Sequence, residues 1–194
     1  IILGIGGSAT NDGGAGIFHA LGGQLLDQNG KAIALGGSAL NDLDSILAAP
    51  IDAKIKWKIA CDVNNPLLGK NGATAVYGPQ KGASATDIQL LENGLSNLSK
   101  CCQKKFNRNM EGVEGGGAAG GTAAGMFGFF NATLEPGFSH LAEMIQLEKF
   151  VANANLIFTA EGKMDTQSIN GKLTVGIARM AKKHKIPIIG LTAN

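Results

Sequence analysis

The first sixteen residues, IILGIGGSATNDGGAG, place a short apolar run directly before a loop of glycines and small polar side chains. Six of these residues are glycines, and they surround Ser8, Thr10, Asn11 and Asp12. In open α/β sheets, ligands bind at loops that follow the carboxyl ends of strands. The stretch therefore allows three alternatives: a dinucleotide site, a site for a phosphoryl group and its metal, or only a turn.

Strand and helix patterns continue along the chain. The residues KIKWKIACD (54–62) alternate apolar side chains with lysines, which predicts a strand with one buried face, at a sheet edge or on an uncovered face. This strand carries Asp62 at its C-terminal end. Residues 63–83 are typical of a loop because proline and glycine punctuate them. Ser84 and Asp87 then form a capping pair before a long helix with one apolar stripe.

The second half of the chain changes character near Asn155. Before it, the glycine-rich stretch EGVEGGGAAGGTAAGMFGFF (111–130) is expected to run into a helix. From Asn155 the pattern becomes strand, polar loop, helix and strand, which predicts a parallel βαβ unit. We therefore expect a domain boundary there, with one domain over residues 1–154 and another over residues 155–194.

Composition argues against several classes of function. Seventeen lysines and arginines against fifteen aspartates and glutamates give a formal charge of +2, which does not support nucleic-acid binding. The longest apolar stretch, residues 117–130, is too short and too glycine-rich to span a membrane. Three cysteines without a C-x-x-C pair favour a reducing cytoplasm and argue against zinc, so a metal would be Mg²⁺ carried by a nucleotide. Because the chain starts inside an apolar run with no initiator methionine, we expect an internal piece of a longer protein.

The opening glycines partly match a dinucleotide-binding fingerprint. Gly4, Gly6 and Ala9 have the spacing G-x-G-x-x-A, and an acidic residue, Asp27, follows about twenty residues later. Against this, a helix has to begin at once to face the pyrophosphate, whereas TNDGGAG (10–16) inserts helix-breaking residues. A Walker-type phosphate loop is excluded, because no Gly-Lys pair has both the upstream glycine and the following serine or threonine. A nicotinamide-dependent hydroxy-acid oxidoreductase remains an alternative.

Three sets of polar residues that follow apolar runs share one chemistry. Each combines a carboxylate with amides or hydroxyls, and two of them add lysines: Ser8, Thr10, Asn11 and Asp12; then Asp62, Asn64, Asn65, Gln80 and Lys81; then Glu161, Lys163, Asp165, Gln167, Ser168 and Lys172. In phosphoryl transfer, a carboxylate binds Mg²⁺ or takes the proton of the attacking hydroxyl, and a cation faces the transferring phosphate. The loops therefore favour phosphoryl transfer.

Each of these residues also has a structural interpretation. Asp12 fits a local turn or helix cap, Asp62 fits a cap for the following segment, and Lys81 fits a solvated loop lysine. Asp165 and Lys172 flank the predicted start of a helix, where the helix dipole alone favours a carboxylate. The histidines and cysteines are expected to be structural.

Taken together, the loops resemble one family. The sequences GIGGSATNDGGAG, ACDVNNPLLGKNGA, YGPQKGA, GGGAAGG and EGKMDTQSINGK, in this order, resemble the bacterial glycerate kinases of the type that includes the 2-phosphoglycerate-forming enzymes. The resemblance covers nearly the whole chain. It implies an ATP-dependent phosphotransferase with an alcohol group as acceptor, which converts D-glycerate to 2-phosphoglycerate or 3-phosphoglycerate.

The resemblance also implies an α/β fold. Residues 1–154 would form most of a mixed-sheet, three-layer inserted domain of the restriction-endonuclease-like type, and residues 155–194 a βαβ piece of a flavodoxin-like domain. The chain departs from the family at AEGK (160–163), where the family usually has GEGR, and lysine lacks the bidentate fork of arginine. The family's N- and C-terminal segments are also absent, so we expect the piece alone to be inactive.

Chemistry suggests roles for the loop residues. We assign Asp62 and Asp165 as catalytic base or Mg²⁺ ligands. The substrate- or phosphate-binding candidates are Gly6, Gly7, Ser8, Thr10, Asn11, Asp12, Asn65, Lys81, Glu161, Lys163, Gln167 and Lys172. The glycine backbone at residues 6–7 and 115–121 is expected to approach the ligand closely, because no Cβ intervenes. The expected partners are D-glycerate and ATP with Mg²⁺, without nucleic acid or membrane. The oligomeric state stays open, and a non-catalytic small-acid-binding module is a second alternative.

Overall fold

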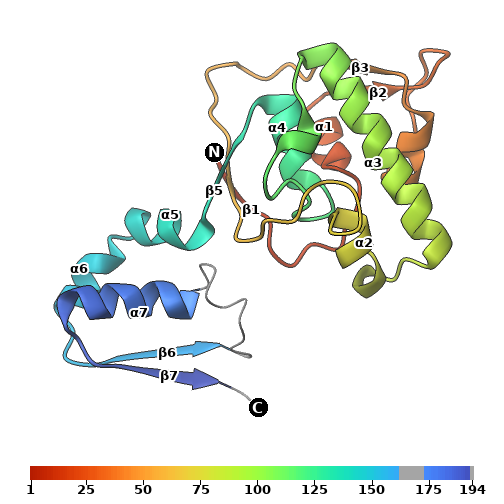
Figure 1. Ribbon diagram of the computed structural model, residues 1–194. Coiled ribbons are helices and arrows are strands. Elements are labelled where there is room, and N and C mark those ends of the chain that lie inside the picture. Colours follow the sequence, from red (N-terminus) through yellow and green to blue (C-terminus); the bar gives the residue numbers. More distant parts are fainter. Residues whose placement is uncertain (162–172, 193–194) are drawn as a thin grey trace. The chain divides into compact units, whose positions relative to one another are not determined.

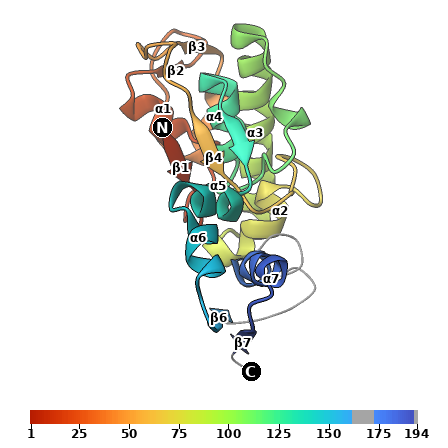
Figure 2. The same cartoon turned by 90° about the vertical axis from the view of Figure 1, so that its left-hand side faces the viewer.

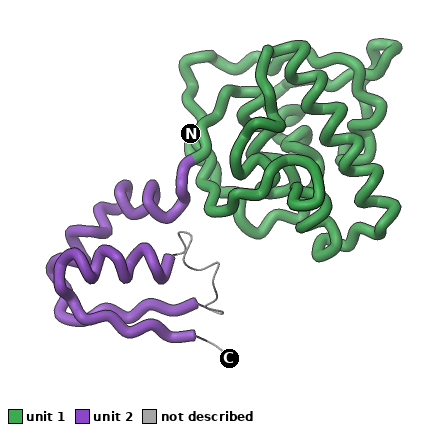
Figure 3. The backbone as a smooth tube through the Cα atoms, viewed as in Figure 1, with its two compact units in different colours: residues 1–134 green, residues 135–194 purple. Residues whose placement is uncertain are grey.

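The chain folds into two compact units. The computed structural model describes residues 1–161 and 173–192. Unit 1 covers Ile1–Leu134 and unit 2 covers Glu135–Asn194 (Figure 3). Both contain helices together with strands, so the predicted mixed α/β class is confirmed. The division into units lies before the domain boundary expected after residue 154, and that assignment of family domains stays a prediction.

Unit 1 is built on a three-stranded sheet. Its strands are β1 (Ile2–Gly4), β4 (Lys58–Ala60) and β5 (Thr133–Glu135), in the order β1-β4-β5. β1 and β4 run parallel, with Leu3 opposite Ile59. The predicted alternation is confirmed in part: Trp57 and Ile59 are buried, whereas Ile55 is exposed, and the strand covers only Lys58–Ala60 of the predicted 54–62. The alternative of an edge strand is wrong, however, because β4 pairs with a neighbour on each side.

Three helices form layers behind this sheet (Figures 1 and 2). They are α1 (Ala15–Ala20), α4 (Thr122–Phe130) and α3 (Ala85–Phe106). α4 is buried on nearly all sides, because Met126 packs with the sheet residues around Ile59 while Phe129 packs with α3 and stacks on Phe18 of α1. This arrangement explains why MFGFF (126–130) is apolar all round rather than amphipathic.

The long helix α3 begins where its sequence predicts. The Ser84 hydroxyl accepts a hydrogen bond from the Asp87 N–H, and the Asp87 carboxylate accepts one from the Ser84 N–H, which is a complete capping box. Leu95, Leu98 and Cys102 of the predicted apolar stripe are buried. The helix ends at Asn107, which has left-handed backbone angles.

Several short elements complete unit 1. β2 (Gln24–Leu26) pairs antiparallel with β3 (Ser45–Leu47), and a 3-10 helix lies over Gly37–Asp42. The segment 63–83, expected to be loop, contains α2 (Ala73–Tyr77) and a 3-10 helix over Pro79–Lys81. That expectation was wrong, because Gly72 and Gly78 flank a single helical turn that is too short to show a helical period.

Unit 2 contains the predicted βαβ arrangement. β6 (Ile157–Glu161) and β7 (Ile188–Thr192) are parallel, and α7 (Leu173–His184) lies between them in the chain. Two further helices precede them, α5 (Gly137–Met144) and α6 (Leu147–Ala152). In the described part of the chain, no helix combines the length and the apolar character needed to cross a membrane.

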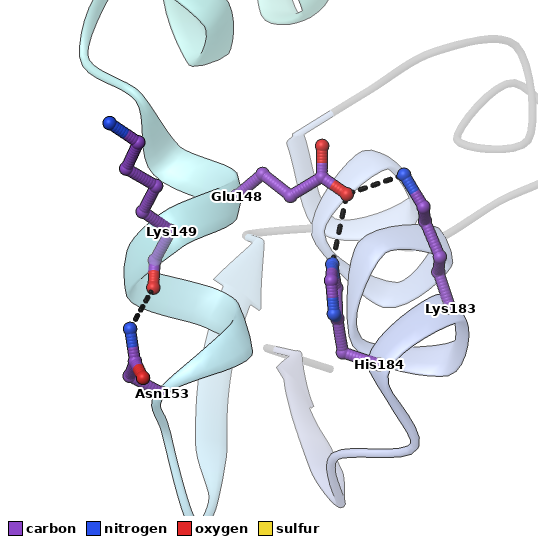
Figure 4. A network of polar contacts seen from close by, with 5 residues as sticks. All are labelled: Glu148, Lys149, Asn153, Lys183 and His184. Carbon is purple, nitrogen blue, oxygen red and sulfur yellow. Dashed lines mark hydrogen bonds and ion pairs between the residues drawn. The ribbon is translucent and has the colours of Figure 1, made fainter.

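A small polar network ties α6 to α7 (Figure 4). The Glu148 carboxylate accepts a hydrogen bond from Lys183 Nζ at 2.6 Å and lies 2.9 Å from His184 Nε2. Both partners stand in the last turn of α7, where cationic side chains suit the negative end of the helix dipole. Glu148 therefore joins the start of one helix to the end of the other.

Candidate active site

A cavity of about 280 Å³ lies where two parallel strands end. The carboxyl ends of β1 and β4 deliver their loops side by side, and a glycine-rich stretch before α4 adds backbone from a third direction. This is the position at which open α/β sheets bind ligands. The residues that line the cavity are Ile5, Gly6, Gly7, Ser8, Ala60, Cys61, Asp62, Val63, Tyr77, Gln80, Lys81, Ala118 and Ala119.

Lys81 is the only lysine or arginine among these lining residues. Its Nζ donates to Ser8 Oγ at 3.0 Å and to the Thr10 carbonyl oxygen at 2.6 Å. Partial burial lowers the pKa of Lys81, and the negative charge of Asp12 works against this shift. Lysine has three N–H donors, so these two bonds leave one for a ligand. The cation is thus fixed across the opening loop rather than being the solvated loop lysine that the sequence also allowed.

The first glycines of the opening loop leave open space beside the cavity. A Cβ atom on Gly6 or Gly7 would meet no atom within 4 Å. Gly7 also has φ of +69°, a backbone conformation that glycine adopts without strain. A ligand can therefore approach the backbone N–H groups of this loop.

The glycines of residues 115–121 serve a different purpose. A Cβ on Gly117 would overlap the Pro66 carbonyl oxygen, and one on Gly120 would overlap that of Thr10. Instead, the Gly117 N–H donates to the Asn65 carbonyl at 2.9 Å. These glycines bring three loops into contact, and within the stretch it is Ala118 and Ala119 that line the cavity.

Asp62 lies at the end of β4, exposed and among the lining residues. Beside it, the Cys61 thiol contacts the Val63 carbonyl oxygen at 3.3 Å. Burial raises the pKa of Cys61 and the neighbouring Asp62 charge raises it further, while a hydrogen bond from the Val63 backbone to the sulfur lowers it. The thiol is therefore a neutral group in the cavity wall, and Asp62 supplies the carboxylate of that wall.

Thr10, Asn11 and Asp12 shape the opening loop. The Asp12 carboxylate accepts hydrogen bonds from the Gly14 and Gly16 N–H groups, each at 3.0 Å, which is the local-turn role that the sequence allowed. The Asn11 amide donates to Thr74 Oγ1 at 3.0 Å. These three residues are absent from the cavity wall described above, so any ligand contact by them stays a prediction.

The remaining candidates lie elsewhere. Asn65 is one step behind the wall, where its side-chain oxygen accepts from the Tyr77 hydroxyl at 2.7 Å. Glu161 ends β6 in unit 2 and accepts from Thr174 Oγ1 at 3.0 Å. Lys163, Asp165, Gln167 and Lys172 lie outside the described residues.

The site residues predicted from the sequence leave out two polar residues of the wall, Tyr77 and Gln80, although Gln80 belongs to one of the polar loops singled out above. Both stand in the segment that was expected to be loop, next to Lys81. The missing signal was the short helix α2, which turns Tyr77 toward the strand ends. A single tyrosine in the whole chain, directly before a Gly-Pro pair, was the one available hint.

The described carboxylates do not gather into a cluster that could hold a metal ion by itself. Among residues 1–161 and 173–192, no group of three or more histidines, cysteines, aspartates or glutamates is placed to hold a metal ion. Mg²⁺ in kinases is typically bound by one or two carboxylates together with substrate phosphates. Asp62 fits such a role, whereas the second predicted ligand, Asp165, lies outside the described residues.

Comparison with known proteins gives one consistent result. The sequence model of the glycerate kinase family matches residues 1–194. The chain is 44% identical to glycerate 2-kinase of Escherichia coli K12 and 43% identical to glycerate kinase of Bacillus subtilis 168, each over 197 aligned residues. Each alignment covers 100% of this chain and 52% of the relative.

A solved structure agrees with the sequence comparison. A crystal structure of a protein assigned as glycerate kinase 2 from Salmonella typhimurium LT2 matches with a TM-score of 0.85 and 43% identity, covering 99% of this chain and 52% of that one. The chain therefore spans about half the length of the relatives it matches. With a family model over its full length and relatives of this identity, the chain belongs to the glycerate kinase family.

Proposed function

We propose that the protein containing this chain is an ATP-dependent kinase that phosphorylates D-glycerate. The observation that carries the proposal is the meeting of Ser8, Asp62 and Lys81 in one cavity at the ends of two parallel strands, in a member of the glycerate kinase family. A carboxylate, a fixed cation and open glycine backbone are the groups that phosphoryl transfer to an alcohol uses.

The cavity suggests a division of labour. The glycerate carboxylate binds the remaining N–H of Lys81 and the backbone of Gly6 and Gly7. Asp62 accepts the proton of the reacting hydroxyl as its oxygen bonds to the terminal phosphorus and the bond to the ADP oxygen breaks. A bound Mg²⁺ would neutralise charge on the phosphates, and holding that ion is the alternative role for Asp62. Asp165 remains proposed as a second carboxylate.

Two finer features belong to the same proposal. The product is 2-phosphoglycerate, a choice supported by the name of the Escherichia coli relative, glycerate 2-kinase. Residues 1–154 belong to a restriction-endonuclease-like inserted domain and residues 155–194 to a flavodoxin-like domain, in a cytoplasmic enzyme. Limited proteolysis of the full-length protein near residue 154 tests the boundary, and phosphorus NMR of the product tests which hydroxyl reacts.

The decisive experiment removes the two charges of the cavity. In the full-length protein, Asp62→Asn and Lys81→Met should each lower kcat/KM for glycerate with MgATP at least about a hundredfold, because the first removes the base for the reacting hydroxyl and the second removes the cation that holds the glycerate carboxylate. Glycerate-dependent ADP release measures this.

Matched controls are Asp42→Asn and Lys100→Met, which change exposed residues of unit 1 outside the cavity wall and should retain wild-type rates. Near wild-type turnover by both cavity variants would refute the assigned roles. Absence of glycerate-dependent ADP release from the wild-type protein, despite glycerate binding, would instead favour a non-catalytic binding module.

A further inference from the structure

We infer that Tyr77 is a specificity-determining residue, whose hydroxyl oxygen accepts a hydrogen bond from the hydroxyl of D-glycerate that is not phosphorylated. The inference rests on the proposed function for the identity of the ligand. It concerns a residue for which the sequence predicts no role. It follows from which atoms donate and which accept in the hydrogen bonds along one wall of the cavity.

The direction of these hydrogen bonds is set by the contact between Asn65 and Asn71. The Asn65 side-chain N–H donates to the Asn71 carbonyl oxygen at 2.9 Å. A carbonyl oxygen only accepts, so this bond fixes the orientation of the Asn65 amide. The Asn65 side-chain oxygen is then the atom that lies 2.7 Å from the Tyr77 hydroxyl.

The Tyr77 hydroxyl is consequently the donor in its bond to Asn65. Its single hydrogen is engaged, so its oxygen offers only lone pairs to any other partner. Burial raises the pKa of Tyr77, and nearby Cys61 raises it further, which keeps the hydroxyl protonated. Tyr77 also lines the cavity, so it presents an acceptor there.

Lys81 lines the same cavity and, unlike Tyr77, offers a hydrogen-bond donor there. Its ammonium has one N–H left after Ser8 and Thr10 are satisfied, so it offers a donor and a positive charge. A cavity with a cationic donor, a carboxylate at Asp62 and a neutral acceptor at Tyr77 complements a small hydroxy acid with two hydroxyls. The acid group meets Lys81, the reacting hydroxyl meets Asp62, and the second hydroxyl donates to Tyr77.

A site that accepts a hydrogen bond from a substrate hydroxyl rejects the analogue that lacks it, because the acceptor then loses its partner. D-Lactate is such an analogue, since it has a methyl group in place of the hydroxymethyl group of D-glycerate. We expect the wild-type protein to bind D-glycerate about three- to tenfold more tightly than D-lactate through this one bond.

The test combines a change in the protein with a change in the ligand. Dissociation constants of D-glycerate and D-lactate are measured by calorimetry for the full-length wild-type protein and for Tyr77→Phe. The substitution should weaken D-glycerate about three- to tenfold, leave D-lactate unchanged, and so abolish the preference between them. Equal weakening of both acids, or an unchanged preference, overturns the inference and leaves Tyr77 a structural residue.

Lys100→Met is the control, because it changes an exposed residue of unit 1 outside the cavity wall. It should preserve the preference for D-glycerate. Turnover is measured separately as glycerate-dependent ADP release. If the wild-type protein turns over glycerate and Tyr77→Phe still prefers D-glycerate to D-lactate, this inference alone is refuted. If Tyr77→Phe loses the preference but the wild-type protein shows no turnover, the kinase proposal alone is refuted. Failure of the wild-type protein to bind either acid refutes both.

Discussion

At the scale of single residues, two glycines of unit 1 differ in the space around them. Gly6 borders open space, whereas Gly120 has φ of +66° and would place a Cβ against the Thr10 carbonyl oxygen. We therefore expect Gly120→Ala to cost about 2 kcal/mol or more and to lower Tm of the full-length protein by at least about 4 °C.

The matched variant Gly6→Ala should change stability by no more than about 0.5 kcal/mol, and it should weaken glycerate binding because its methyl group enters the cavity. Thermal unfolding and calorimetric titration measure both variants. Equal losses of Tm in the two variants would show that the distinction between open and packed glycines is wrong.

Single residues also show how far the site can be predicted from sequence. Ser8, Asp62 and Lys81 are identifiable because each lies in a polar loop and has a side chain suited to phosphate chemistry, and the structure brings all three to one cavity. Tyr77 is not identifiable in this way, because its role depends on Asn65 and Asn71, whose hydrogen bonds are invisible before folding.

At the scale of helices and strands, periodicity predicts the long elements and not the short ones. α3 and the βαβ arrangement of unit 2 are long enough to display a period of 3.6 or an apolar strand, and both are confirmed. α2 has five residues between glycines, so no period can be read. β4 is a central strand because it pairs with β5, more than seventy positions further along the chain. The alternation of lysines with apolar residues does not reveal this pairing.

The contact between α6 and α7 makes stability in unit 2 depend on pH. Hydrogen bonds from Lys183, then from His184, hold the pKa of Glu148 below its ordinary value of 4.5. A lowered pKa in the folded state means that the contact stabilises above about pH 4.5 and that this is lost as pH falls through the folded value.

Hydrogen exchange of α6 and α7 in the full-length protein measures this. Protection in wild type should fall as pH drops below about 4.5, and Glu148→Gln should remove that dependence because its side chain does not titrate there. An identical pH profile in the variant would assign the dependence to other groups.

At the scale of the whole molecule, the chain spans about half the length of its relatives, so the complete protein is the proper object for ligand tests. We expect MgATP to raise Tm of the full-length protein, by an amount equivalent to about 2.7 kcal/mol at a hundred times its Kd, and NADH or NADPH to leave Tm unchanged. Thermal scans with each nucleotide measure this. Stabilisation by a nicotinamide cofactor and not by MgATP would restore the oxidoreductase alternative.

The bonds from Lys81 to Ser8 and Thr10 also have an entropic consequence. A free lysine side chain carries about 2 kcal/mol of rotamer entropy, much of which an anion must remove when it captures a mobile ammonium. Here folding has already restricted that motion, so less conformational entropy is lost when the acid arrives. Binding of glycerate is therefore expected to resemble the docking of a ligand into a rigid receptor more than the ordering of a surface side chain.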